Sequence, residues 1–127
     1  MSVLISVGLA FLLGTFVLRI VAGFTPGFEL EDWSATMVTA LILTVLHEGL
    51  AFLWPASIDR GDAFPWKFHA AAFVVNVIGV GFASMAVGGV RMRGAGSLIV
   101  AAVLLTAFGY ATALAVTQVM TQLPLTF

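Results

Sequence analysis

The sequence of 127 residues contains no cysteine and very little charge. Without cysteine the chain has no disulfide, no thiolate ligand for a metal and no cysteine nucleophile. Charged residues make up 9% of the sequence, against roughly 25% in an average soluble domain. The net charge is −1, and no basic cluster is larger than Arg91 with Arg93. We therefore expect no nucleic acid partner.

What the sequence does contain is long apolar stretches, and hydrophobic residues make up 61% of the chain. A bilayer core about 30 Å thick is crossed by about 20 helical residues. Four segments reach that length, at residues 3–22, 33–53, 68–88 and 97–116. We predict an all-α integral membrane protein in which residues 1–127 form one four-helix transmembrane bundle surrounded by lipid. Because little chain remains outside the spans, we predict no enzyme activity, no catalytic residue, no metal and no cofactor.

The breaks between the spans are marked by turn residues and by tryptophan. The first break contains Pro26 and Gly27 followed by acidic residues, the second contains Pro55 and Pro65, and the third is rich in glycine. Trp33, Trp54 and Trp66 lie at span ends, where aromatic rings favour the membrane interface. The first and third breaks must share one side of the membrane. Basic residues are divided three against two between the sides, so they do not determine the orientation.

The chain aligns weakly with itself when it is shifted by 62 residues. Residues 26–28 then coincide with 88–90, and residues 40–43 coincide with 102–105, at equivalent places relative to the spans. An offset that covers two spans predicts two repeated helical hairpins related by an axis along the membrane normal. The alternative is that any two apolar helices align this well.

Several short motifs resemble a known family. They are the Pro26-Gly27-Phe28 turn, the aromatic Trp33, the Val75-Asn76-Val77 run and the Gly89-Val90-Arg91-Met92 turn. Together with the four short spans, they look like the small bacterial four-span phage holin family, holin superfamily four. The resemblance covers most of the chain and implies a pore-forming membrane protein. The sequence departs from the family where span two reads Leu46-His47-Glu48-Gly49, in place of an Asn and an Arg-Pro pair.

Polar and ionisable residues inside the spans are candidates for a functional site, because they are costly in hydrocarbon. Glu48 lies six residues before Trp54, which corresponds to a depth of about 9 Å. Arg19 lies near the end of its span, where its side chain can reach the interface. We predict one intramembrane polar cluster near the side that carries the second break and both termini: His47, Glu48, His69, Asn76 and Tyr110, with Ser6 close by.

Small residues at helical spacing predict the faces through which the helices pack. On span two, Ala40, Thr44 and Glu48 recur every four residues and should face inward. The helix-packing residues that we predict on spans three and four are Gly79, Ala83, Ala107, Ala111 and Ala115.

These features favour a holin-like oligomeric pore or small exporter in a prokaryotic cytoplasmic membrane, which self-associates through its small-residue faces. An alternative is a non-conducting accessory or assembly subunit of a larger membrane complex. A third hypothesis is a haem- or quinone-binding membrane protein that uses His47 and His69. For Glu48 itself, a packing role, an ion or proton pathway and a ligand or metal site all stay open.

Overall fold

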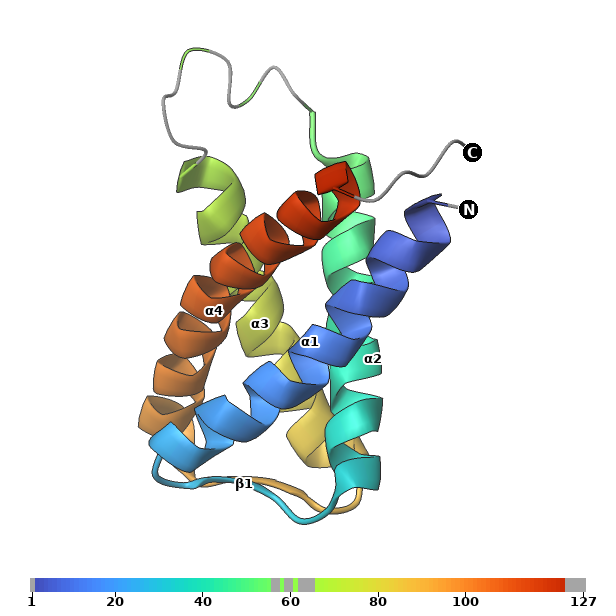
Figure 1. Ribbon diagram of the computed structural model, residues 1–127. Helices are drawn as coiled ribbons and strands as arrows, with labels where there is room; N and C mark the ends of the chain where they lie inside the picture. The colour runs from blue at the N-terminus through green and yellow to red at the C-terminus, as the bar shows by residue number, and fades with distance from the viewer. Residues whose placement is uncertain (1, 56–57, 59–60, 62–65, 123–127) are drawn as a thin grey trace.

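The computed structural model describes residues 2–55, 58, 61 and 66–122. Within these residues the chain forms α1 (Ser2–Phe24), β1 (Phe28–Leu30), α2 (Trp33–Leu53), α3 (Trp66–Ala86), β2 (Val90–Met92) and α4 (Gly94–Gln122). All four helices are long and apolar enough to cross a membrane. The prediction of an all-α, four-helix integral membrane protein is therefore confirmed (Figure 1).

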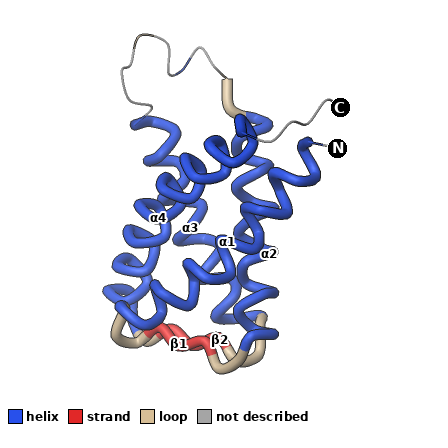
Figure 2. The backbone as a smooth tube through the Cα atoms, viewed as in Figure 1, coloured by secondary structure: helices blue, strands red, loops and turns tan. Residues whose placement is uncertain are grey.

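The helices form a ring in which α1 and α3 each pack against both α2 and α4. The start of α1 and the end of α4 lie at one end of the bundle, which we call the terminal end (Figure 1). The two short strands lie at the opposite end, which we call the strand end (Figure 2). The first and third breaks therefore share one side of the bundle, as the sequence predicts.

The helix boundaries follow from local chemistry. Asp32 caps α2, because its side chain accepts a hydrogen bond of 2.8 Å from the backbone N–H of Ala35. The helix ends before Trp54, and Pro55 follows. The sequence predicts the last span to end near residue 116, whereas α4 continues to Gln122. No proline or glycine interrupts residues 117–122, so nothing in that segment stops the helix.

Strands β1 and β2 pair in antiparallel register, with Glu29 opposite Arg91. Two further backbone bonds extend the pairing: Glu31 N–H donates to the Gly89 carbonyl over 2.7 Å, and Arg93 N–H donates to the Gly27 carbonyl over 2.8 Å. These two bonds are related by the 62-residue shift, because it carries Glu31 to Arg93 and Gly27 to Gly89. The pairing of the two strands thus follows the symmetry that two repeated hairpins would have, and the repeat itself stays a prediction. The strands themselves were not predicted, since three-residue segments give too short an alternation.

The well-packed core lies toward the strand end. Val21, Val80, Ala83 and Ala101 have no exposed surface there. Gly79 allows α2 and α3 to approach closely, because a Cβ at this position would lie 2.5 Å from Cδ2 of Leu43. Gly79 and Ala83, two of the residues predicted to pack helices, are both buried on α3.

The predicted packing role of the third small-residue face is wrong for the contacts within this chain. Ala107, Ala111 and Ala115 are all exposed on the outer surface of α4. The helix instead turns Ala101, Ala102, Leu105 and Val116 toward the bundle. Alanine occurs on both sides of α4, so spacing alone did not distinguish the inner face from the outer one.

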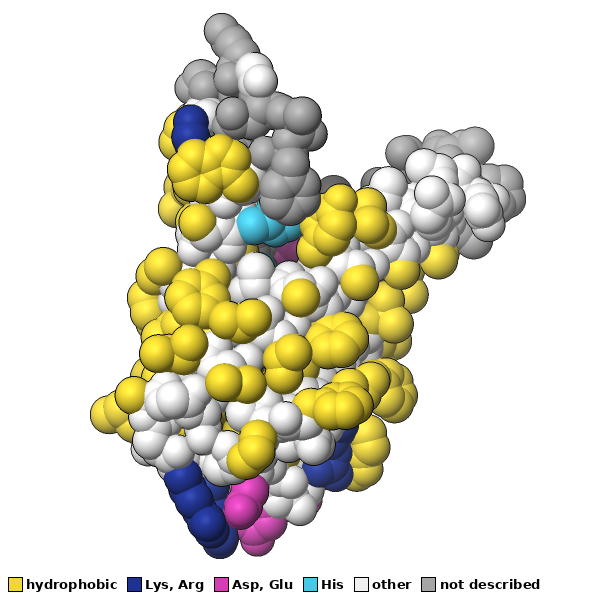
Figure 3. Space-filling view, turned by 90° about the vertical axis from the view of Figure 1, so that its left-hand side faces the viewer, with side chains coloured by type: hydrophobic (Ala, Val, Ile, Leu, Met, Phe, Trp, Pro, Cys, Tyr) yellow, Lys and Arg dark blue, Asp and Glu magenta, His cyan; other side chains and the backbone are white. Residues whose placement is uncertain are grey.

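Charged side chains gather at the strand end, below a largely apolar belt (Figure 3). Glu29 lies 3.9 Å from Arg91 and 3.5 Å from Arg93, and all three side chains are substantially exposed. Arg19 reaches this end as predicted: its guanidinium donates a 3.0 Å hydrogen bond to the Leu30 carbonyl and lies 4.4 Å from the centroid of the Trp33 ring.

Candidate functional site

Toward the terminal end, the bundle contains a partly open cavity of about 340 Å³. All four helices contribute to its walls: residues 6–18 of α1, 40–51 of α2, 68–76 of α3 and 105–117 of α4. A histidine and an acidic side chain are visible in a hollow at this end (Figure 3). The bundle is therefore tightly packed on one side of the membrane and hollow on the other.

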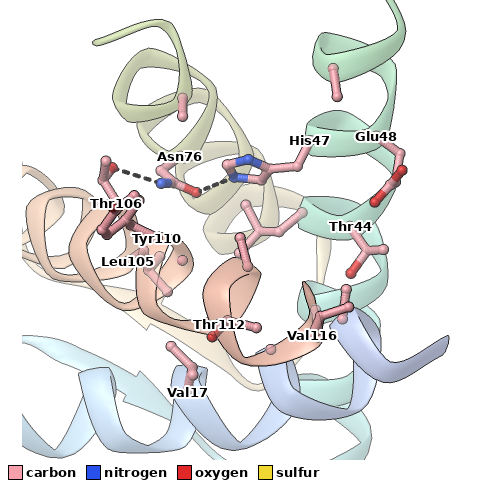
Figure 4. Close-up of a pocket in the computed structure, with 18 of the residues that line it drawn as sticks. Val17, Thr44, His47, Glu48, Asn76, Leu105, Thr106, Tyr110, Thr112 and Val116 are labelled. Carbon is pink, nitrogen blue, oxygen red and sulfur yellow. Dashed lines mark hydrogen bonds between the residues drawn. The ribbon is translucent and has the colours of Figure 1, made fainter. Parts of the chain in front are cut away.

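A chain of hydrogen bonds crosses the cavity wall from α2 through α3 to α4 (Figure 4). His47 Nε2 lies 2.8 Å from Asn76 Oδ1, and Asn76 Nδ2 donates to Thr106 Oγ1 over 2.9 Å. Thr106 Oγ1 in turn donates to the Ala102 carbonyl over 2.8 Å. A hydroxyl has only one proton, so Thr106 must accept from the Asn76 amide. The Asn76 oxygen then faces His47, and the proton of that contact is on Nε2.

Asn76 is the central member of this chain of bonds and is 1% exposed. Its amide joins three helices, which fixes the separation of α2, α3 and α4 around the cavity. Polar side chains bonded in this way hold membrane helices together, because lipid offers them no partner.

Aromatic rings line the cavity near the terminal end. His69 and Tyr110 meet edge to face with ring centroids 5.1 Å apart, and Phe68 and His69 meet at 5.7 Å. Trp54 at the end of α2 packs against Phe68 with centroids 5.6 Å apart. These contacts connect the end of α2 with α3, and α3 with α4.

Glu48 lies at the edge of the cavity between α2 and α1, and it is exposed. The predicted inward stripe of span two is therefore correct only in part: Ala40 is buried, Thr44 is partly buried, and Glu48 lies at the rim. No hydrogen bond or ion pair connects its carboxylate to another residue in the described part of the chain.

The cavity arises from a difference between the two repeats. The 62-residue shift carries Gly14 to Asn76 and His47 to Gly109. On one side of the bundle, His47 and Asn76 fill the space between α2 and α3, whereas Gly14 and Gly109 stand at the equivalent positions on α1 and α4. Both glycines line the cavity, and a Cβ at either position would meet no atom within 4 Å. The absence of side chains at these two positions therefore contributes to the open volume.

All five residues of the predicted polar cluster line this one cavity, and so does Ser6. Sequence reasoning missed Gly14, Gly109 and the threonines Thr106 and Thr112. The 62-residue self-alignment could have identified Gly14, because it aligns this glycine with the polar residue Asn76.

The hypothesis of a metal or haem site depends on His47 and His69. Both line the cavity, but His47 is bonded to Asn76 and His69 packs between two aromatic rings. In residues 2–55, 58, 61 and 66–122, no group of three or more His, Cys, Asp or Glu side chains is placed to hold a metal ion. The described side chains that line the cavity offer hydrogen-bonding groups and one carboxylate, that of Glu48.

No protein-family model, curated protein or solved structure matches this chain.

Proposed function

We propose that this protein is a membrane-embedded binding protein that holds the polar end of a small molecule in the central cavity. The observation that carries the proposal is the cavity built by Gly14 and Gly109 opposite the hydrogen-bonded pair His47 and Asn76. Its volume of about 340 Å³ lies in the usual range for ligand pockets, and its apolar walls with few polar groups are typical of them.

The hydrogen-bonded chain orients the groups that a ligand would meet. His47 uses Nε2 to bond Asn76. No hydrogen bond from the described residues uses its Nδ1, so this atom can accept a hydrogen bond from a ligand. The Asn76 amide is fully used and acts as a positioning group. Because these side chains are already ordered, a ligand can bind to them without the entropic cost of ordering them.

The test is to fill the cavity without damaging the fold. In Gly14→Leu/Gly109→Leu the new side chains enter open space, and leucine favours a helix over glycine by about 0.5–1 kcal/mol at each position. We expect a variant that is at least as stable as the wild type in thermal unfolding. Small molecules that co-purify with each protein are then extracted with organic solvent and identified by mass spectrometry.

We expect a small molecule in near-stoichiometric amount with the wild type and its loss from the filled variant. Gly23→Leu is the matched control, since it adds the same side chain to open space outside the cavity. Equal amounts in all three preparations, or none in any, would contradict the proposal.

A second candidate is the holin-like pore or exporter in a prokaryotic cytoplasmic membrane. It is favoured by the exposed face of Ala107, Ala111 and Ala115, because small residues on a lipid-facing surface allow a second copy to approach closely. Self-association is needed for this function, since the strand end of a single bundle is closed by fully buried side chains such as Val80 and Ala101.

The pore is tested with Ala111→Cys, which is the sole cysteine in the resulting chain. We expect the pore to give cross-linked oligomers in membranes and dye release from liposomes, and we expect Ala111→Leu to abolish both. Ala86→Leu on α3, at another exposed position, is the control. A monomer that releases no dye would exclude the pore, and co-purification with larger subunits would favour an accessory role.

A further inference from the structure

We infer that the cavity is entered from the bilayer through the gap between α1 and α2, and that its ligand is a single-chain amphiphile with a positively charged head group that contacts Glu48. This inference rests on the proposed binding function and names the class of ligand. It is carried by three observations: an outer groove that shares two lining residues with the cavity, the charge of the lining, and the aromatic rings of the cavity wall.

A groove of about 470 Å³ runs between α1 and α2 on the outer surface of the bundle. Thr44 and Glu48 belong to the lining of this outer groove and also to that of the central cavity. These two side chains therefore form the boundary between the outer groove and the central cavity. The rest of the outer groove is apolar: Leu4, Val7, Gly8, Phe11, Leu41 and Val45. A hydrocarbon chain fits such a surface, because the helices present it to lipid.

The charge of the lining favours a ligand with a positively charged head group. Among the described residues that line the two spaces, Glu48 is the one acidic side chain, and none is Lys or Arg. An ionised carboxylate at this depth is costly unless a cation accompanies it. Arg19 cannot supply that cation, since its guanidinium is bonded to Leu30 and stacked on Trp33 at the strand end. A ligand that brings a positive charge would offset the cost.

The cavity also offers aromatic surface to a cationic head group. Phe68 and Tyr110 line it, together with the His69 ring that packs between them. Aromatic faces attract quaternary ammonium and amine groups. The arrangement fits an amphiphile whose tail lies in the outer groove and whose head passes Glu48 into the cavity.

The experiment measures equilibrium binding to the purified protein in dodecyl maltoside, a detergent with an uncharged head group. Three probes share one tail and differ in charge: hexadecyltrimethylammonium, hexadecanol and hexadecanoate. We expect saturable binding of the ammonium probe, with at least tenfold weaker binding of the other two. Glu48→Gln should lower the affinity for the ammonium probe at least tenfold, because it removes the charge and keeps the shape.

Two controls separate the site from general effects. Glu29→Gln removes a carboxylate at the strand end, outside both spaces, and should leave the affinity unchanged. Gly8→Leu fills the outer groove at a position where a Cβ meets no atom, so it should weaken binding several-fold, whereas Gly23→Leu should not.

Two results would overturn the inference and leave the binding function standing. One is an affinity of Glu48→Gln for the ammonium probe equal to that of the wild type, and the other is equal affinity of the wild type for hexadecanol and the ammonium probe. The binding function stands in either case if Gly14→Leu/Gly109→Leu still removes the co-purifying molecule. If the filled variant binds the ammonium probe as the wild type does, the probe is outside the cavity and the inference is wrong. The proposed function itself fails only if the extraction experiment also shows no difference.

Discussion

Gly27 and Gly89 are equivalent residues of the two repeats, and each is covered by the start of the helix that follows the other. Both have positive φ, at +89° and +92°. A Cβ on Gly27 would lie 2.5 Å from Ser97 Oγ, and a Cβ on Gly89 would lie 3.1 Å from the Cβ of Ala35. Ala35 and Ser97 are themselves related by the 62-residue shift. The two halves of the chain therefore hold one another at the strand end by the same contact, made twice.

This relationship predicts that Gly27→Ala and Gly89→Ala each destabilise the bundle. Each substitution combines an unfavourable positive φ with a close contact, at a cost of about 1–3 kcal/mol. The measurement is thermal unfolding in detergent, followed by circular dichroism. Gly88→Ala is the control, because its Cβ would meet no atom within 4 Å. Equal melting temperatures for Gly88→Ala and Gly89→Ala would refute the prediction.

Asn76→Leu is expected to lower stability although it keeps a similar volume. The change leaves the His47 N–H and the Thr106 hydroxyl without the amide that joins them. Interhelical polar contacts in membranes contribute up to about 1–2 kcal/mol. Thr121→Val, which removes an exposed hydroxyl bonded to the backbone, is the control and should have little effect. A loss of stability no larger than that of the control would contradict the assigned role of Asn76.

Arg19→Lys should also destabilise the bundle, although the charge is kept. A lysine ammonium lacks the planar group that lies over Trp33 and donates to Leu30. We expect a loss of about 1 kcal/mol. Arg91→Lys serves as the comparison, because the Arg91 side chain is 64% exposed and makes a long ion pair. Similar unfolding temperatures for the two variants would show that only the charge of Arg19 matters.

Glu29→Gln is expected to change stability by less than about 0.5 kcal/mol, because exposed ion pairs contribute little. The Glu29 side chain is 48% exposed, and its distances to Arg91 and Arg93 are long. Unfolding at low and high salt should therefore give nearly the same difference between the variant and the wild type. A loss above 1 kcal/mol that salt removes would mean that the charges, more than the backbone bonds, hold β1 to β2.

The residues of the candidate site were largely predictable, but their arrangement was not. His47, Glu48 and Asn76 stand out in apolar spans, and depth alone assigned them to one end of the bundle. The bond from Asn76 to Thr106 could not be foreseen, because many threonines occur in the spans and the rotation of α4 selects one of them. The same rotation turned the face of Ala111 outward.

The sequence by itself determined the membrane class and the number of spans in the described chain, because these depend on composition and on spacing along the chain. Only the tertiary structure decided that the strand end is packed and the terminal end hollow. That outcome depends on which side chains meet across the ring of helices. Gly14 and Gly109 line the cavity on α1 and α4, across the bundle from Asn76 and His47. Whether a glycine borders a cavity or a close helix contact depends on the side chains that face it in the fold, and the sequence alone does not give these.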